Sequence, residues 1–301
     1  MSIVDILIPT FDNVQLLIPC VNSILNNQST INKIIIINNG KVPVESFVKT
    51  TEKVVVVSSK ENLGWEGGLK LGLEHSKAKF VCFMNDDTLV PKTSRQWLEN
   101  MLYLFSDQSV AAIGPVSNCV AGLQSIFHPG TPYTPINVTY LIGFCMLLRR
   151  EHLDKVGGID ETLPGGDDFD LSIRLRKAGY NLLIQPDSFI YHHGFVTGTK
   201  IHGGPEKEGG WNSREMTDRT NKALIQKHGF RTFIETITGY VYDGQGFVED
   251  DKEGEIIRKY VPRGTIIELG CGAKKTVSDA IVIDIIPNGE LIPGLPNIHR
   301  S

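Results

Sequence analysis

The sequence predicts an α/β protein with a mainly parallel sheet and helices on both of its faces. Short apolar runs alternate with amphipathic helical segments over about the first 115 residues, an order that is typical of parallel strands joined by helical crossovers. Each apolar run ends in a polar or turn-forming cluster. The chain of 301 residues is 41% hydrophobic and 21% charged, as expected for one large or two ordinary globular domains.

The first half of the chain supplies most of the predicted sheet. The expected strands are 3–8, 33–37, 54–57, 80–85 and 110–113, and the expected helices are 12–27, 64–77 and 94–105. Pro19 lies inside the first helix and is expected to kink it or to mark its start. A stretch rich in Pro, Gly and Ser over 114–135 predicts loops, and an apolar stretch over 138–149 contains Gly143.

The second half continues with shorter elements. A helix over 151–156 is expected to end at Gly157-Gly158, and another begins at Asp167, where acids in the first turn favour the helix dipole. Strands over 181–184 and 188–191 run into His192-His193. The stretch 195–212 is long for a connection, which predicts a mobile lid. Ser213 is expected to cap the helix that follows.

Charge and cysteine content exclude several classes of protein. The net charge of −4 provides no basic field, so no nucleic-acid partner is expected. The five cysteines are scattered, which predicts reduced thiols in a cytoplasmic protein and no disulfide or zinc framework. We expect no signal peptide, and no apolar run reaches the roughly 18 residues of a membrane span. Peripheral association with the inner face of a membrane is compatible with these features.

The stretch from Phe80 to Thr88 carries the strongest functional signal. A buried strand is predicted to run into Asn85, Asp86 and Asp87, and ligands collect at the carboxyl ends of strands in open α/β sheets. Adjacent carboxylates suit Mg²⁺ or Mn²⁺, which take oxygen ligands and share them with substrate phosphates. A polar turn before the next helix explains the same residues equally well. The residues at the other strand ends are therefore needed to choose between a metal site and a simple turn.

Motifs at the predicted strand ends follow one another in a recognisable order. They are Pro9-Thr10-Phe11-Asp12, Asn38-Asn39-Gly40, Asn62-Leu63-Gly64-Trp65-Glu66-Gly67-Gly68, Asn85-Asp86-Asp87 and Asp167-Asp168-Phe169-Asp170-Leu171. The ordered set, over residues 1–230, resembles the family 2 glycosyltransferases of the GT-A fold, in particular the rhamnosyltransferase-like branch with its PTYN, DNGS, NxGxxGG, NDD and EDxDL motifs. The resemblance implies an inverting transfer of a sugar from a nucleotide-diphosphate donor to the hydroxyl of a glycan, lipid-linked or other acceptor, in polysaccharide or glycan synthesis.

The resemblance also implies catalytic and metal-binding roles. Asp87 is expected to ligate Mn²⁺ or Mg²⁺, which would stabilise the diphosphate leaving group, and Asp86 to bind the donor ribose or the metal through water. His192 is expected to complete the metal shell, in preference to His193. Inversion needs a base opposite the leaving group, and Asp168 is expected to be that base, with Asp167 as the alternative.

Donor binding is expected from the motifs of the first half. The residues are Pro9, Thr10, Phe11, Asp12, Asn38, Asn39, Asn62, Gly64, Gly67, Gly68 and Asp86. The glycines would let the backbone approach the nucleotide closely, although a tight turn and helix packing explain them as well. The family usually has Asp in place of Asn38 and a small residue in place of Glu66, so the nucleotide preference stays open.

The end of the chain is predicted to be a separate segment. Residues 1–238 form the predicted GT-A domain, residues 239–254 an acidic, Gly-rich linker, and residues 255–301 a partial Rossmann-like fragment. The strand that ends in Glu268-Leu269-Gly270-Cys271-Gly272, followed by Asp284, resembles the start of class I S-adenosylmethionine-dependent methyltransferases. A Rossmann half this short cannot bury a stable core alone, so we do not expect it to use S-adenosylmethionine.

Two other functions compete with glycosyl transfer. A nucleotidyltransferase would be expected to have a Gly-rich loop with Lys or Arg after the first strand, and Pro9-Thr10-Phe11-Asp12 is not such a loop. A non-catalytic relative that binds carbohydrate or nucleotide sugar would be expected to lack the metal motif or the base. Because the sequence has both, glycosyl transfer is the favoured prediction.

Overall fold

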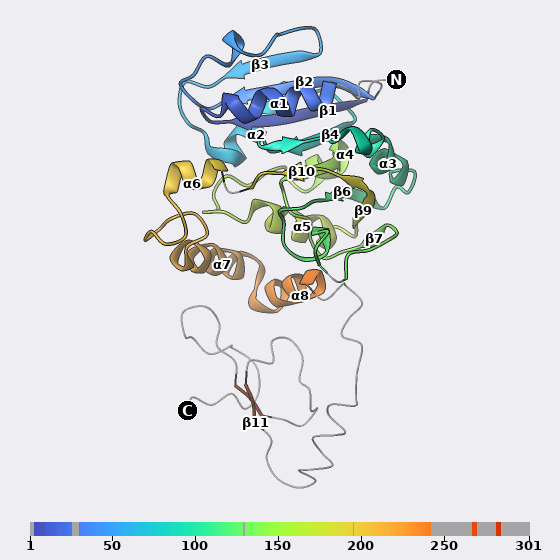
Figure 1. The fold of residues 1–301 in the computed structure, drawn as a ribbon. Coiled ribbons are helices and arrows are strands. Elements are labelled where there is room, and N and C mark those ends of the chain that lie inside the picture. Colours follow the sequence, from blue (N-terminus) through green and yellow to red (C-terminus); the bar gives the residue numbers. More distant parts are fainter. Residues whose placement is uncertain are drawn as a thin grey trace.

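The computed structural model describes residues 3–25, 30–128, 130–194, 196–241, 267–269 and 281–283. An eight-stranded sheet forms its centre, in the order β3-β2-β1-β4-β8-β6-β9-β7 (Figure 1). The parallel strands are β1 (Val4–Thr10), β2 (Ile31–Asn38), β3 (Val54–Ser58), β4 (Phe80–Met84), β6 (Val110–Val116) and β9 (Asn181–Phe189). Two strands are antiparallel to their neighbours, β7 (Ile136–Asn137) at the edge and β8 (Cys145–Arg149) between β4 and β6. The predicted mainly parallel α/β architecture is confirmed.

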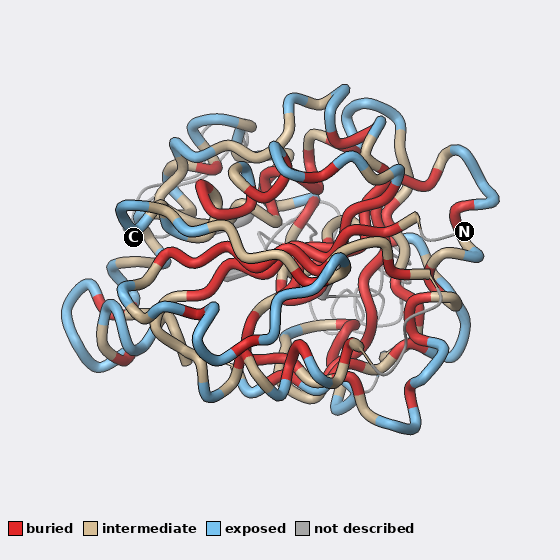
Figure 2. Tube along the Cα trace, turned by 90° about the horizontal axis from the view of Figure 1, so that it is seen from above, coloured by how far each residue is buried: buried red, intermediate tan, exposed pale blue. Residues whose placement is uncertain are grey.

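Helices cover both faces of the sheet because side chains alternate along its strands. Ile6 and Ile8 of β1 pack in one apolar cluster with residues of α1 (Val14–Leu25) and α3 (Trp97–Leu104). Leu7, between them, packs in a second cluster with residues of α2 (Gly64–Glu74), α4 (Arg150–Lys155) and α5 (Asp167–Lys177). In Figure 2, the strands form a continuous buried band between more exposed segments on either side. Short 3₁₀ turns lie at Val44–Ser46, Lys92–Ser94 and Gly122–Gln124.

A small ladder at the carboxyl edge of the sheet brings two distant parts of the chain together. Strand β5 (Thr88–Leu89) follows β4 directly and pairs antiparallel with β10 (Tyr191–His192), with His192 opposite Thr88. The segment after the acidic turn and the segment after β9 are therefore neighbours. This pairing places the predicted metal-binding histidine beside the acidic motif.

Two further helices pack against α5. Helix α7 (Arg214–His228) begins at Ser213, whose hydroxyl accepts a hydrogen bond from Met216 N, and ends at Gly229, as predicted. Helix α8 (Phe230–Val241) follows directly and was not expected. An apolar cluster of Phe169 and Ile173 of α5 with Leu224 and Phe233 joins the three helices.

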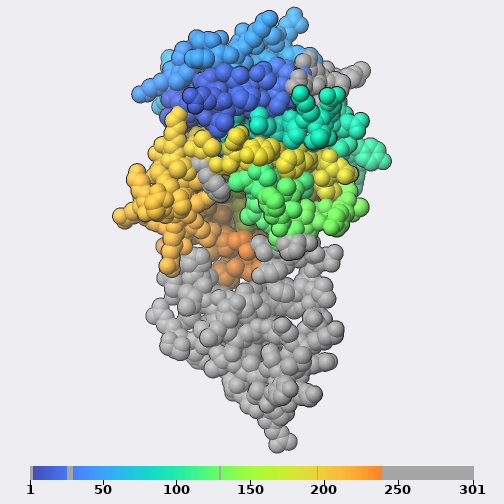
Figure 3. All heavy atoms as spheres, in the orientation of Figure 1, coloured from blue at the N-terminus to red at the C-terminus, as the bar shows by residue number. Residues whose placement is uncertain are grey.

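Two regions differ from the sequence-based expectation. The stretch 195–212, predicted to be a long and mobile lid with no helix assigned to it, contains helix α6 (Val196–His202), which lies against the N-terminal part of the chain (Figure 3). The two strands expected over 181–191 are one long strand, β9, followed by β10, and β9 contains Pro186. Pro186 is tolerated there because Asn181–Phe189 shifts its register against β6 and proline occurs at such irregularities.

In the final segment of the chain, the structure describes two short strands. Strand β11 (Ile267–Leu269) pairs in parallel with β12 (Ile281–Ile283), close to the strands expected there. Gly270-Cys271-Gly272 and Asp284 lie outside the described residues, so the methyltransferase resemblance stays a prediction. No helix within the described ranges is long and apolar enough to cross a membrane.

Candidate functional site

Asp86 joins the first motif of the chain to the acidic motif. It is 4% exposed, and its Oδ2 accepts a 2.6 Å hydrogen bond from the Thr10 hydroxyl at the end of β1. The Asn13 side-chain amide donates to Oδ1 at 3.2 Å. Burial raises the pKa of Asp86 to about 6, although the Thr10 hydrogen bond acts in the opposite direction. These contacts confirm that the ends of β1 and β4 form one polar site, as parallel strands require.

Asp87 and His192 form a buried pair next to this carboxylate. Asp87 is 4% exposed and His192 is 9% exposed, and Asp87 Oδ1 lies 3.2 Å from His192 Nε2. The pair exists because the β5–β10 ladder aligns His192 with Thr88. His193, the neighbouring candidate, is exposed and its ring contacts Tyr191 edge to face.

The hydrogen bonds around His192 leave its Nε2 without a proton when the ring is neutral. Its Nδ1 lies 2.9 Å from the Cys119 carbonyl oxygen, which accepts only, so we assign the ring proton to Nδ1. The Asn85 amide nitrogen lies 3.3 Å from Nε2 and can donate to it. The buried Asp87 Oδ1 has no hydrogen-bond partner among the described residues. Two hydrogen-bond acceptors, each with a lone pair, therefore face each other at 3.2 Å, an arrangement that a cation between them would satisfy.

The Asp87–His192 pair fits a divalent cation that also binds substrate oxygens. The described residues contain no group of three or more His, Cys, Asp and Glu that could hold a metal ion. Protein side chains of the described residues therefore do not complete the coordination of a metal ion at this site. Mg²⁺ characteristically takes one or two protein carboxylates plus substrate phosphates, and imidazole suits Mn²⁺. A ligating histidine usually donates its other ring N–H to a carbonyl, as His192 does to Cys119.

The predicted donor-binding residues at the ends of β1 and β2 are tied to each other. Asp12 has a positive φ of 50°, and its Oδ1 accepts hydrogen bonds from the backbone N–H groups of Lys41 (2.7 Å) and Val42 (2.8 Å). The Lys200 ammonium of α6 donates to the Asp12 carbonyl oxygen at 2.7 Å. Asp12 thus fixes the strand ends and contacts α6. Phe11, which precedes it, is half-buried.

The two asparagines after β2 have different surroundings. Asn38 uses its side chain within its own turn, accepting from Gly40 N at 3.0 Å and donating to the Val42 carbonyl at 2.9 Å. Asn39 donates to the Gly64 carbonyl at 2.7 Å, but its buried Oδ1 has no hydrogen-bond partner among the described residues. Of the two predicted donor-binding asparagines, Asn39 is therefore the one whose side-chain oxygen lacks a partner among the described residues.

The glycine motif packs α2 closely against these strand ends. Asn62 Oδ1 accepts from Gly64 N at 2.9 Å, and Gly64 has a positive φ of 72°, which favours glycine. A Cβ atom at Gly68 would lie 2.8 Å from Asn39 Nδ2 and 3.1 Å from Pro9 Cβ, and one at Gly67 would lie 2.9 Å from Leu63 Cβ. Gly67 and Gly68 are therefore needed for packing, which was the second of their two explanations.

Asp168 is held by backbone N–H groups on both of its oxygens. Oδ2 accepts from Gly143 N at 2.9 Å and Oδ1 accepts from Phe169 N at 2.8 Å. Gly166, in the left-handed conformation (φ 72°), precedes α5 and presents this turn to the site. Burial raises the pKa of Asp168 despite these hydrogen bonds. A carboxylate with a raised pKa and one free electron pair on each oxygen can accept a proton.

Residues 143 and 144 connect the Asp168 carboxylate to the metal-binding pair. Gly143 donates to Asp168, and the ring of the next residue, Phe144, stacks on His192 with 5.1 Å between ring centroids. The Phe144 carbonyl also accepts from Asn85 N at 2.9 Å. Two consecutive residues in the turn before β8 thus contact the candidate base, the candidate metal ligand and the acidic motif.

Asp167 is contacted by Trp65 and affected by the charge of Glu66, two residues to which the sequence assigned no role. Trp65 Nε1 donates to Asp167 Oδ2 at 3.0 Å. Burial raises the pKa of Asp167 well above its ordinary value, and the nearby charges of Asp168 and Glu66 add to this. The one signal in the sequence was that Glu66 replaces a small residue of the family motif.

Asp170 organises the helices behind the site. It is fully buried and accepts from Arg174 Nε at 2.8 Å and from His228 Nε2 at 2.7 Å, and the Lys227 ammonium also contacts its Oδ1. Burial raises the pKa of Asp170, but the hydrogen bonds from Lys227 and Arg174 outweigh this, and the net pKa is lowered. Asp170 thus joins Arg174 of its own helix to Lys227 and His228 of α7.

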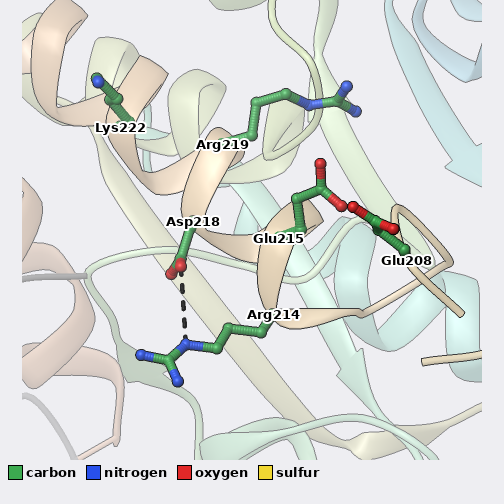
Figure 4. A pocket seen from close by; sticks show the side chains of 6 residues that line it. All are labelled: Glu208, Arg214, Glu215, Asp218, Arg219 and Lys222. Atoms are coloured by element: carbon green, nitrogen blue, oxygen red, sulfur yellow. Dashed lines mark ion pairs between the residues drawn. The ribbon is translucent and has the colours of Figure 1, made fainter. Parts of the chain in front are cut away.

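A separate hollow on the surface of α7, lined by charged side chains, differs from the buried site at the sheet edge. It is lined by Glu208, Arg214, Glu215, Asp218, Arg219 and Lys222 (Figure 4). Its acids and bases are equal in number, and its one ion pair, Arg214–Asp218, has an N–O distance of 3.8 Å with the arginine side chain 91% exposed. Such solvated pairs contribute little energy, so the site at the sheet edge is the better candidate.

Comparison with known proteins gives one family and several partial relatives. Residues 5–157, about half of the chain, match the model of glycosyl transferase family 2. Pre-mycofactocin glycosyltransferase of Mycobacterium tuberculosis H37Rv is 30% identical over 177 residues, which cover 53% of this chain and 37% of the relative. N-acetylglucosaminyl-diphospho-decaprenol L-rhamnosyltransferase of the same strain is 31% identical over 87 residues, covering 24% and 28% respectively.

Solved structures share the fold at low sequence identity. GalNAc-T7, solved with UDP, GalNAc and Mn²⁺, has a TM-score of 0.58 and 14% identity, covering 79% of this chain and 51% of its own. A mannosyltransferase from Pyrobaculum calidifontis, solved with GDP-Man and Mn²⁺, has a TM-score of 0.54 and 16% identity, covering 86% and 81%. Both likenesses concern the α/β fold of the described residues.

Proposed function

Because the chain belongs to glycosyl transferase family 2, we propose that it transfers a sugar from a nucleotide-diphosphate donor to an acceptor hydroxyl. Its structural neighbours are glycosyltransferases of the expected GT-A fold. The chain spans only 37% of the first curated relative, so activity, substrates and partners are proposed for this chain from its own site. Inversion, metal dependence and the residue roles below are parts of the proposal.

The observation that carries the proposal is the contact made by residues 143 and 144. Through Gly143 and Phe144, the Asp168 carboxylate and the Asp87–His192 pair lie in one site. Inverting transfer needs a charge-stabilising group at the leaving diphosphate and a base at the other face of the sugar. This chain offers one candidate for each, on two sides of a single turn.

Donor binding is assigned to the carboxyl edge of the sheet. Thr10 holds the Asp86 carboxylate in place, so that Asp86 can accept hydrogen bonds from ribose hydroxyls, and Asn39 Oδ1 is free to accept from the donor. Asp87 and His192 would hold Mn²⁺ or Mg²⁺, which when bound supplies positive charge next to the diphosphate oxygens. His192 is kept in the ligating tautomer by Cys119.

Proton removal from the acceptor is assigned to Asp168. The Gly143 and Phe169 amides fix both of its oxygens, so the carboxylate keeps one orientation while the acceptor hydroxyl approaches. Its raised pKa makes it a stronger base than an ordinary aspartate. As the sugar–oxygen bond forms, the hydroxyl proton moves to Asp168 and the nucleoside diphosphate leaves with the electron pair of the broken bond.

The acceptor and the domain organisation are finer parts of the proposal. The local similarity to a rhamnosyltransferase whose name includes a diphospho-decaprenol acceptor supports a glycan or lipid-linked acceptor in polysaccharide synthesis, with peripheral membrane association as one consequence. We also propose the division into a GT-A domain (1–238), a linker (239–254) and a methyltransferase-like fragment (255–301). Helix α8 extends to Val241, slightly into the proposed linker.

The proposal is tested by a donor screen on the full chain. Thermal shift and donor hydrolysis are measured with UDP-, GDP- and dTDP-sugars in Mn²⁺, Mg²⁺ or EDTA. We expect at least one donor to stabilise the protein in a metal-dependent manner and to be hydrolysed. A chain that binds a donor but hydrolyses none, and transfers to no acceptor, would be a non-catalytic relative.

The base is tested by Asp168→Asn. We expect transfer to fall about 10²- to 10⁴-fold, the usual contribution of a positioned base, with donor affinity nearly unchanged. Asp154→Asn, a matched change at an exposed position of α4, should keep full activity. Normal turnover of the Asp168 variant would exclude this residue as the base.

A further inference from the structure

The loop after β6 displays large apolar side chains to solvent. Ile126 is 43% exposed, Phe127 is 76% exposed and Tyr133 is 96% exposed. They are three of the seven large hydrophobic side chains that are exposed among the described residues. Single exposed apolar residues need no explanation, whereas several in one short segment indicate a surface for interaction. The described residues of 117–135 are called the apolar loop below.

The base of the apolar loop is fixed to the protein. Gln124 is fully buried, and its side-chain amide donates to the Pro115 carbonyl oxygen at 2.8 Å. The Ile126 N–H donates to the Ser117 carbonyl oxygen at 3.0 Å, which closes the loop onto its own start. Ile126 and Phe127 are therefore exposed by a loop whose base is hydrogen-bonded in place.

The apolar loop lies in a long stretch of the chain that has no charged side chains. Residues 108–148 contain no Asp, Glu, Lys or Arg, and His128 is their one histidine, although 21% of the whole chain is charged. Charged groups give protein–protein contacts much of their specificity and their rate of association. This loop offers no fixed charge to such a partner, and it has no acid that the anionic headgroups of a membrane would repel.

The apolar loop also holds the candidate metal ligand. The Asn118 side chain accepts from His192 N at 2.9 Å and donates to the His192 carbonyl oxygen at 3.0 Å, and the Cys119 carbonyl oxygen lies 2.9 Å from His192 Nδ1. In Figure 3, the green segment that contains the loop lies beside the yellow segment that contains β10. A partner that seats on Phe127 would therefore meet the same part of the molecule as the site proposed for sugar transfer.

The exposed apolar area is small for a complex between two proteins. An aromatic side chain buries about 150–250 Å², so Ile126, Phe127 and Tyr133 together offer on the order of 400 Å² at their observed exposures. A stable interface needs about 800 Å² on each partner, whether the partner is another protein or a second copy of this chain. A bilayer interface has no such threshold, because binding grows with each apolar group that is buried.

We propose that Ile126, Phe127 and Tyr133 insert into the interface of a lipid bilayer and bring the site to acceptors at the membrane surface. This inference rests on the proposed transfer to a lipid-linked acceptor and names the surface that meets the membrane. Ile126 and Phe127 supply apolar area. Tyr133 suits the boundary between lipid and water, where tyrosine is enriched in membrane proteins.

The binding test uses flotation of the full chain with vesicles of phosphatidylethanolamine and phosphatidylglycerol. Phe127→Ser and Tyr133→Ser should each lower the partition coefficient about tenfold, the effect of losing one large buried apolar side chain. Tyr103→Ser is the matched control, because Tyr103 is 77% exposed on α3, outside the apolar loop, and it should bind as the unchanged chain does. Absence of vesicle binding by the unchanged chain, or equal binding by all four chains, would overturn the proposal.

A second measurement reports where the loop lies when the protein is bound. The added indole of Phe127→Trp should be quenched by brominated lipids beyond the quenching of the unchanged chain, whereas that of Tyr103→Trp should not. Sedimentation velocity without vesicles tests the other occupant. A dimer of the unchanged chain that Phe127→Ser abolishes would assign the loop to a second copy and overturn insertion into the bilayer.

Vesicle binding needs no sugar donor, so the two proposals fail separately. If no donor is ever transferred but vesicle binding depends on Phe127, the glycosyltransferase proposal fails while the membrane-binding surface stands. If sugar is transferred but the unchanged chain does not bind vesicles, the glycosyltransferase proposal stands and the membrane-binding surface is refuted.

Discussion

Replacing Asp87 with asparagine should stabilise the metal-free protein and at the same time remove metal-dependent donor binding. In the structure, Asp87 Oδ1 is buried without a hydrogen-bond partner and lies 3.2 Å from His192 Nε2. Because His192 Nδ1 donates its proton to the Cys119 carbonyl, Nε2 carries no proton and its lone pair faces the Asp87 carboxylate. Asparagine has the same shape and supplies an N–H group that can donate to Nε2.

The size of both effects follows from this contact. One new buried hydrogen bond between neutral groups contributes about 0.5–1.5 kcal/mol, and removal of a buried unpaired charge adds to it. For a domain of this size, about 1 kcal/mol raises the unfolding temperature by about 2–4 °C. Loss of an anionic metal ligand should weaken metal-dependent binding by at least the 10- to 100-fold that is typical of losing an outer-shell partner.

Two measurements separate these effects. Thermal unfolding in EDTA compares the unchanged chain with Asp87→Asn and with Asp154→Asn, the surface control. Calorimetric titration with UDP and with GDP, each with Mn²⁺ or with EDTA, gives the metal-dependent part of the affinity. An Asp87→Asn chain that is less stable in EDTA, or that keeps the full effect of Mn²⁺ on nucleotide affinity, would refute the assignment of this pair.

Further predictions concern the elements that support the site. Asp170→Asn removes the buried carboxylate that Arg174, Lys227 and His228 share, while Lys227 keeps its ion pair with Asp160, and should cost about 3 kcal/mol in denaturant unfolding. The folded-state pKa of Asp170 is lowered, so the stability that its carboxylate contributes is present above about pH 4 and is lost as pH falls. The difference in unfolding free energy between the unchanged protein and Asp170→Asn should therefore shrink in acid. A difference that stays constant with pH would contradict this prediction. Gly68→Ala brings a Cβ atom within 2.8 Å of Asn39 Nδ2 and 3.1 Å of Pro9 Cβ, and should destabilise the protein by about 1–3 kcal/mol and weaken nucleotide binding. Gly72→Ala, whose Cβ would lie 2.9 Å from Ile37 Cδ1 and 3.3 Å from Leu7 Cδ1, both at flexible side-chain ends, should cost less in the same unfolding assay, and equal losses would argue against a special role of Gly68.

Much of the fold could be predicted because its signals are local. Apolar runs such as the one over β4 and the polar clusters that follow them predicted parallel strands whose carboxyl ends meet, and the Thr10–Asp86 contact confirms that they do. Helix caps such as Ser213 and Gly229 are likewise written into a few neighbouring residues. Helix α6 was missed because its seven residues contain no buried position, so no apolar stripe marks it in the sequence.

The sequence by itself determined the succession of strands and helices along the first part of the chain, the acidic turn after β4 and the acidic start of α5. Only the tertiary structure decided which of these groups meet. The Asp87–His192 pair depends on a two-residue antiparallel ladder, and the different surroundings of Asp167 and Asp168 depend on an indole from α2 and a backbone amide from Gly143. The physical reason is that strand ends follow from local hydrophobic pattern, whereas single hydrogen bonds between distant segments leave no periodic trace in the chain.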